Sequence, residues 1–234
     1  MFTQISLMET IAQKYNKISS RVLELNPNTT LVSVSKLKPI EDLKEAYEAG
    51  CRVFGENYVD ELVEKAPQLP EAKFHLIGHL QSNKVSKVCH IDNLAMIETV
   101  DSIKLADKIN NSWGNQRAPL PIMVQVNTSE EPQKFGIQRG ESLINLIDHI
   151  NKNCKNLLFK GLMTIGEIGE SKRDFETLID IRKECSEALK CDINTIELSM
   201  GMSSDYELAC TMGASYVRVG SSIFGARPPK VIQK

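Results

Sequence analysis

Short apolar segments rich in β-branched residues alternate along this chain with segments whose apolar residues recur every three or four positions. The first pattern predicts buried strands, and the second predicts helices with one face against a core. Eight strands with helices in the gaps predict one α/β domain, a closed parallel (β/α)8 (TIM) barrel, with a doubly wound open sheet as the alternative. The expected strands are 31–36, 52–55, 74–78, 96–100, 122–127, 159–165, 195–200 and 217–220. The expected helices are 39–50, 57–66, 82–90, 102–112, 140–153, 171–190 and 204–213.

A further helix is expected before the first strand, within residues 1–29. Its apolar residues run at helical spacing from Ile5 through Ile11 and Ile18 to Leu25, with charged residues between them. This amphipathic pattern differs from a secretion signal, which needs an uninterrupted apolar stretch. We therefore expect this helix to pack on the barrel, with 1–234 forming a single domain.

Composition narrows the class of protein. The 234 residues suit a single barrel, which typically has about 250. A net charge of −2 argues against a nucleic-acid partner, and no apolar run reaches membrane-spanning length. The six cysteines form no C-x-x-C pair, which is typical of reduced thiols in the cytoplasm.

Two polar features fall at the carboxyl ends of expected strands, where barrel proteins carry out their chemistry. Lys36 ends the first strand, and Gly220-Ser221-Ser222 follows the last one. A glycine–serine turn at a helix start offers backbone N–H groups to a phosphate. A desolvated lysine has a lowered pKa, and its neutral amine can form a Schiff base. Together they predict a phosphorylated aldehyde bound to Lys36, although a solvated surface role for Lys36 and a competing Lys38 remain open.

Arg218 interrupts the apolar eighth strand, and its alternation with the flanking valines predicts that it faces the barrel interior. A buried arginine needs a partner, which could be an internal carboxylate or a ligand's ring nitrogen or phosphate. Segment 199–204 follows the seventh strand, where the second half of a phosphate cup belongs. Ser203 or Ser204 could also cap the helix that follows.

The histidines do not predict a metal site. His75 and His79 lie on either side of a strand end instead of on one helix face, and His90 and His149 have no informative neighbours. We therefore expect no bound metal.

Six motifs occur in order and together resemble the pyridoxal 5′-phosphate (PLP) homeostasis protein family, the single-domain relatives of the alanine racemase barrel. The resemblance extends over residues 5–229, with Ser221 standing where many members have threonine. The motifs are Val34-Ser35-Lys36-x-x-Pro39, Phe54-Gly55-Glu56-Asn57-Tyr58-Val59, His75-x-Ile77-Gly78-x-Leu80-Gln81-x-Asn83-Lys84, Gly161-Leu162-Met163, Ser199-Met200-Gly201-Met202-Ser203 and Arg218-Val219-Gly220-Ser221-x-Ile223-Phe224-Gly225-x-Arg227.

This resemblance implies that PLP is the cofactor and that Lys36 holds it as an internal aldimine. It also implies that Arg218 faces the pyridine nitrogen. Lys134 matches a family lysine, for which a part in cofactor transfer is one interpretation. The remaining site residues that the resemblance implies are Ser199, Ser203, Gly220 and Ser221 for the phosphate, and Asn57, His75 and Met200 for the walls.

An arginine at the pyridine nitrogen leaves that nitrogen unprotonated, which makes the ring a weaker electron sink. The related racemase also needs a second base from a C-terminal domain and a partner subunit, and we expect this chain to lack that domain. We therefore expect a monomeric, cytoplasmic, non-catalytic carrier or buffer of PLP that contacts PLP-dependent apoenzymes transiently. The alternatives are a PLP-dependent amino-acid racemase and, more distantly, a Schiff-base aldolase acting on a sugar phosphate.

Overall fold

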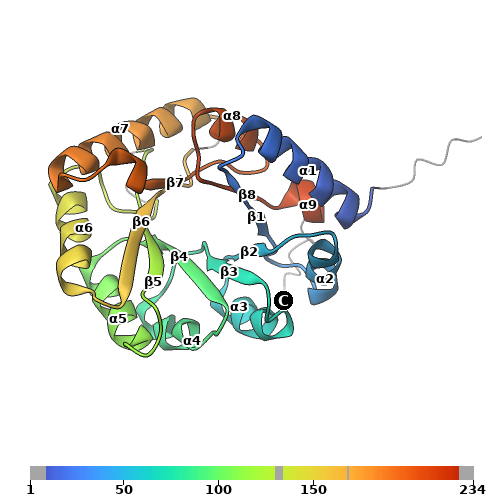
Figure 1. The fold of residues 1–234 in the computed structure, drawn as a ribbon, viewed down its shortest axis with the longest axis horizontal. Coiled ribbons are helices and arrows are strands. Elements are labelled where there is room, and N and C mark those ends of the chain that lie inside the picture. The colour runs from blue at the N-terminus through green and yellow to red at the C-terminus, as the bar shows by residue number, and fades with distance from the viewer. Residues whose placement is uncertain (1–8, 130–133, 168, 227–234) are drawn as a thin grey trace, which may run out of the picture.

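The structure, a computed structural model, describes residues 9–129, 134–167 and 169–226 of the chain. Eight parallel strands form a closed barrel in which each strand pairs with the next and β8 pairs with β1 (Figure 1). The (β/α)8 prediction is therefore confirmed, and the open-sheet alternative is wrong. The strands are β1 (Thr30–Val34), β2 (Val53–Glu56), β3 (Lys73–Leu76), β4 (Leu94–Val100), β5 (Leu120–Gln125), β6 (Leu157–Met163), β7 (Glu197–Ser199) and β8 (Tyr216–Val219).

Helices surround the barrel, and their buried apolar faces pack against the outside of the strands. Three short 3₁₀ turns, η1 (Ala66–Gln68), η2 (Ser82–Lys84) and η3 (Ile193–Thr195), complete the connections. The helices are α1 (Ile11–Leu25), α2 (Ile40–Glu48), α3 (Val59–Lys65), α4 (Val85–Cys89), α5 (Ile103–Trp113), α6 (Glu141–Asn153), α7 (Ser171–Leu189), α8 (Tyr206–Thr211) and α9 (Ser221–Phe224).

The N-terminal helix α1 packs on the barrel through its apolar face. Thr10 and Gln13 form a capping box at its start, and Ile18 and Val22 are buried. The helix contacts α2, α8 and α9, and Figure 1 shows it between α8 and α2. Ile5 and Met8, which belong to the predicted pattern, lie outside the described residues.

Part of the barrel interior is filled by apolar side chains. Met96, Met123 and Met163 form one buried cluster, and Tyr216 packs against it. Arg218 lies two residues further along β8, on the same inward face as Tyr216, because side chains alternate along a strand. The interior therefore holds a buried apolar cluster and, two residues beyond Tyr216, a buried arginine.

Candidate functional site

A cavity of about 320 Å³ opens at the carboxyl ends of the strands. Its volume lies at the lower end of the range of small-molecule sites, about 300–1,000 Å³. The predicted site residues on its wall are Lys36, Asn57, Ser203, Arg218, Gly220 and Ser221. The other lining residues are Val34, Lys38, Ile77, Ile165, Met202, Ser204, Phe224 and Gly225.

Lys36 reaches this cavity from a turn and not, as the sequence predicts, from the end of the strand, because β1 already ends at Val34. Both neighbours of Lys36 are held by carboxylates of the next β–α unit. Ser35 Oγ donates to Glu56 Oε1 at 2.7 Å, and Leu37 N donates to Glu61 Oε2 at 2.8 Å. Leu37 has a φ of 61°, a conformation that costs a non-glycine residue about 1–2 kcal/mol. The lysine backbone is thus fixed on both sides.

A buried lysine neutralises these carboxylates. Lys65 is 5% exposed, and its Nζ lies 2.9 Å from Glu56 Oε1 and 2.5 Å from Glu61 Oε2. It also donates to the backbone carbonyl of Ser35 at 2.9 Å. Burial raises the pKa of Glu56, and the charge of Lys65 opposes this shift. Sequence reasoning missed this cluster, although Glu61 and Lys65 stand at the i,i+4 spacing of a helical ion pair.

Lys38, the competing lysine, lines the same cavity but is engaged elsewhere. Its Nζ donates to the backbone carbonyl of Ala226 at 2.8 Å. Both lysines therefore line the cavity. The turn of Lys36 is held by carboxylates that bind its neighbours Ser35 and Leu37, whereas Lys38 is held through its own Nζ.

Arg218 faces the barrel interior and is 4% exposed. Its Nη1 donates to Ser199 Oγ at 2.7 Å, and its Nη2 donates to the carbonyl of Thr164 at 2.7 Å. Ser199 Oγ in turn donates to Glu98 Oε2 at 2.6 Å, and Glu98 Oε1 lies 2.7 Å from His75 Nδ1. A carboxylate therefore balances the guanidinium through one serine, while the arginine still lines the cavity.

Burial and charge oppose each other in this chain of contacts. Burial lowers the pKa of Arg218. Burial alone would raise the pKa of Glu98, but the hydrogen bond from His75 and the charges of His75 and Arg218 bring it below its usual value. Glu98 thus stays ionised and keeps a counter-charge beneath Arg218. Sequence reasoning missed Glu98, and the available signal was a carboxylate inside the apolar strand 96–100.

Three predicted site residues lie outside the cavity wall. His75 lies on β3, two residues before the cavity-lining Ile77, and contacts Glu98 and the ring of Tyr216. Ser199 lies beneath Arg218, where its hydroxyl is occupied by two hydrogen bonds. Met200 follows Ser199 directly, and its fully buried side chain belongs to the core that the helices share. The alternation of side chains along each strand accounts for these positions.

The loop after β7 meets the end of β8 to form a cup. Gly220 N donates to Ser203 Oγ at 3.1 Å, which joins the two segments. The predicted helix cap is wrong, because α8 begins at Tyr206 with Asp205 before it, and Ser203 and Ser204 line the cavity instead. The short helix α9 begins at Ser221, and the first N–H groups of a helix have no partner within it.

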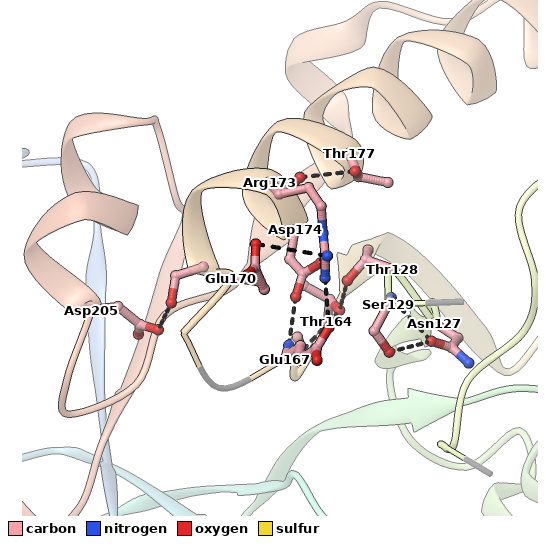
Figure 2. Close-up of polar contacts among 12 residues, drawn as sticks. Asn127, Thr128, Ser129, Thr164, Glu167, Glu170, Arg173, Asp174, Thr177 and Asp205 are labelled. Carbon is pink, nitrogen blue, oxygen red and sulfur yellow. Dashed lines mark hydrogen bonds and ion pairs between the residues drawn. The ribbon is translucent and has the colours of Figure 1, made fainter. Parts of the chain in front are cut away.

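Asp205 fixes this cup to the neighbouring helix. Its Oδ1 accepts from Met202 N at 2.5 Å, and its Oδ2 accepts from Ser171 Oγ at 2.5 Å. Figure 2 shows Asp205 beside the first turn of α7. The cup is therefore anchored before any ligand arrives.

The loop after β6, drawn in Figure 2, is also tied down at the cavity rim. Thr164 Oγ lies 2.9 Å from Thr128 Oγ and accepts from Gly166 N at 3.2 Å. Asp174, which is fully buried, accepts from Glu167 N and from Arg173. These contacts hold the backbone whose Thr164 carbonyl binds Arg218.

Lys134 lies outside this cavity. It lines a separate hollow of about 210 Å³ on the other side of Ile165, a residue that both share. Its neighbour Phe135 stacks on His79 with ring centroids 4.1 Å apart. The structure therefore separates Lys134 from the other predicted site residues.

Two observations fit a polar cofactor in the larger cavity. Asn57 Oδ1 is buried and finds no hydrogen-bond partner among the described residues, so a ligand donor could satisfy it. A Cβ at Gly78 would lie 2.1 Å from the carbonyl oxygen of Asn57, so only glycine permits this close approach. A lysine amine, an arginine and a serine–glycine cup on the same wall suit an aldehyde that carries a phosphate and a ring nitrogen.

Residues 8–228 match the family described as alanine racemase, N-terminal domain, so the chain belongs to this class of barrels. The human pyridoxal phosphate homeostasis protein is 49% identical over 210 residues, covering 84% of this chain and 76% of its own. The Schizosaccharomyces pombe protein of the same name is 44% identical over 207 residues, with coverages of 86% and 85%. The chain therefore belongs to the pyridoxal phosphate homeostasis proteins.

A solved relative carries the cofactor. PipY of Synechococcus elongatus, whose structure has PLP bound, is 31% identical and superposes with a TM-score of 0.78. The match covers 92% of this chain and all of PipY, 100%. The resemblance expected from the six sequence motifs is thus confirmed at the level of the family.

Proposed function

We propose that this protein binds PLP covalently through Lys36 and stores or delivers the cofactor as part of cellular PLP homeostasis. The observation that carries the proposal is one cavity whose wall contains Lys36, Arg218 and the Ser203–Gly220 cup. The names of the human and yeast relatives and the PLP bound to PipY support it.

Each wall residue has a distinct role in this proposal. Lys36 supplies the amine, and its clamped turn holds that amine toward the cavity. Ser203, Gly220 and Ser221 bind the phosphate, and the Asn57 side chain hydrogen-bonds the ring substituents. When bound, PLP supplies an electrophilic aldehyde on an electron-withdrawing ring.

The residues behind the wall act through those on it. Ser199 and Glu98 orient Arg218, and His75 supports Glu98 from the other side. We assign Met200 to packing, because its side chain belongs to the core under the helices.

The same wall favours a carrier over an enzyme. Arg218 is a donor without an acceptor, so a ring nitrogen facing it stays unprotonated. Among the described residues that line the cavity, the ionisable side chains are the cations Lys36, Lys38 and Arg218. Racemisation needs an acid–base partner on each face of the substrate. A racemase remains the second candidate, because the barrel belongs to the alanine racemase class.

The cellular setting is part of the proposal. All six cysteines are free, and five of them are buried, which supports a reducing compartment such as the cytoplasm. No helix in the described ranges is long and apolar enough to cross a membrane. We propose a monomer that contacts PLP-dependent apoenzymes transiently when it delivers the cofactor.

The direct test is borohydride reduction of the protein mixed with PLP, followed by peptide mapping. We expect the reduced adduct on Lys36, and we expect Lys36→Ala to lose both the adduct and the near-visible absorbance of lysine-bound PLP. Lys38→Ala is the matched variant and should retain both. Adducts spread over surface lysines in parent and variant alike would contradict the proposal.

Exchange of the α-proton of alanine in D₂O separates carrier from racemase. A carrier exchanges no faster than free PLP at the same concentration, because the described part of its cavity wall offers no carboxylate, histidine or tyrosine as a second acid–base group beside the lysines. Exchange with enzymatic turnover that disappears in Lys36→Ala would favour the racemase.

A further inference from the structure

Three side chains with different donor atoms meet outside the barrel, between helices α5 and α6. Asp107 lies on α5, His149 lies near the end of α6, and Cys154 follows α6 directly. Their donor atoms all lie within 4.8 Å of one another. Within residues 9–129, 134–167 and 169–226, no other group of three such side chains converges in this way.

One carboxylate oxygen is the centre of this cluster. Asp107 Oδ1 lies 2.7 Å from His149 Nε2 and accepts from the Cys154 thiol at an Sγ–Oδ1 distance of 3.7 Å. Asn153 Nδ2 lies 3.2 Å from the other ring nitrogen of His149, Nδ1. A cation entering here would meet oxygen, nitrogen and sulfur donors together.

We propose that Asp107, His149 and Cys154 bind a divalent transition-metal ion, with Zn²⁺ the best match and water as the fourth ligand. Carboxylate, imidazole and thiolate are the three ligand types that Zn²⁺ takes in proteins. With bonds of about 2.0–2.3 Å, tetrahedral ligand atoms lie roughly 3.3–3.7 Å apart.

The donor atoms already lie near one another, all within 4.8 Å, and must adjust to reach this geometry. The present Sγ–Oδ1 distance of 3.7 Å already fits, and the 2.7 Å Nε2–Oδ1 contact must lengthen. The side chains of Asp107 and His149 are 48% and 25% exposed, so solvent reaches the open position.

Metal binding has a definite proton balance. When no metal is bound, the Cys154 thiol carries its proton, which it donates to Asp107 Oδ1. As the S–Zn bond forms, that proton leaves to solvent. The imidazole proton moves from Nε2 to Nδ1, where the side-chain oxygen of a reoriented Asn153 accepts it, as second-shell partners of zinc-bound histidines do.

The site would join elements that otherwise only pack together. Cys154 accepts a backbone hydrogen bond from Leu157 at the start of β6, so the ion would connect α5, the end of α6 and β6. Figure 1 shows α5 and α6 far from β1 and α9, which border the PLP cavity. The proposal is therefore structural and independent of PLP binding.

The test is a Co²⁺ titration of metal-free protein, because cobalt reports its ligands in the absorption spectrum. We expect one equivalent to produce tetrahedral visible bands and a near-ultraviolet sulfur-to-cobalt charge-transfer band, both removed by one equivalent of Zn²⁺. Cys154→Ser should abolish the charge-transfer band. Cys191→Ser, which removes an exposed thiol outside the cluster, should retain it.

A second variant guards against misfolding of Cys154→Ser. Asp107→Asn keeps the thiol and changes the shape of the side chain on α5 very little. It should weaken Co²⁺ binding by at least about tenfold, because even loss of a residue that only supports a metal ligand weakens binding by about that factor. Zn²⁺ should raise the melting temperature of the parent and Cys191→Ser, but leave that of Cys154→Ser unchanged. Absence of the charge-transfer band in the parent, or its persistence in Cys154→Ser, would overturn the proposal.

Discussion

Glu98 is the residue on which the position of Arg218 depends. It is fully buried, and it contacts His75 directly and Arg218 through Ser199. A buried guanidinium without a counter-charge is strongly unfavourable. Glu98 therefore allows a cation to face the cavity from inside the barrel.

We predict that Glu98→Gln lowers the free energy of unfolding by roughly 3 kcal/mol, because it removes the stronger of the two carboxylate charges, Glu98 and Asp205, that compensate buried Arg218. It should also weaken PLP binding, since Ser199 and Arg218 lose their fixed partner. Urea unfolding and absorbance titration with PLP measure the two effects. The matched control is Glu184→Gln, which removes a half-exposed pair with Arg139 and should change stability by about 1 kcal/mol at most.

The effect of Glu98→Gln should depend on pH in a defined direction. The folded-state pKa of Glu98 lies below its usual value of 4.5, so its carboxylate adds stability above that pH. This contribution is lost as the pH falls through the folded-state pKa. The stability difference between parent and variant should therefore narrow below pH 4.5, and a constant difference would show that charge is not its cause.

At the scale of elements, loops on neighbouring β–α units hold the cavity together. The turn carrying Lys36 depends on carboxylates from β2 and α3, and the loop after β7 depends on a serine of α7 through Asp205. Each functional loop is thus fixed by the unit beside it. This arrangement preorganises the Ser203–Gly220 cup, and under the proposed function it lowers the entropy lost when PLP binds.

We predict that Asp205→Ala weakens PLP binding by about tenfold, because losing one or two hydrogen bonds of about 1 kcal/mol each frees the loop 202–205. Equilibrium titration of PLP, read by absorbance, measures the effect. Glu207 is half-exposed on α8 and pairs with Arg21, so Glu207→Ala should bind PLP like the parent. Equal affinities for the two variants would count against an anchoring role of Asp205.

At the scale of the whole molecule, the first helix completes the ring around the barrel. The helix after β8, α9, has only 4 residues, too few to cover the outside of β8 and β1. Helix α1 fills this position and contacts α2, α8 and α9. The chain thereby closes its outer layer with a segment that precedes all eight strands.

We predict that Ile18→Ala lowers the free energy of unfolding by roughly 2–5 kcal/mol, the usual cost of truncating a buried isoleucine. Chemical denaturation gives the value. Leu23→Ala lies on the same helix but is 62% exposed, so its effect should stay within about 0.5 kcal/mol. If both variants behaved alike, α1 would not be packed as described.

The sequence by itself determined the order of strands and helices and the general position of the site, and it favoured the barrel, whereas closure of the sheet was decided by the structure. Strand and helix periodicities are local properties, so eight apolar segments and the helices between them could be predicted without coordinates. The carboxyl ends of parallel strands meet at one rim, so Lys36 and Gly220, far apart in the chain, could be assigned to one site. Arg218 could be directed inward because side chains alternate along a strand.

Only the tertiary structure decided which inward residues form the wall and which lie beneath it. His75 and Ser199 fall in the lower layer, and Glu98 joins them there, because depth in a barrel depends on the register between strands. The convergence of Asp107 and His149 depends on how two helices pack, a relation that no local pattern contains. Contacts between residues far apart in the chain arise only when the strands close and the helices settle on them.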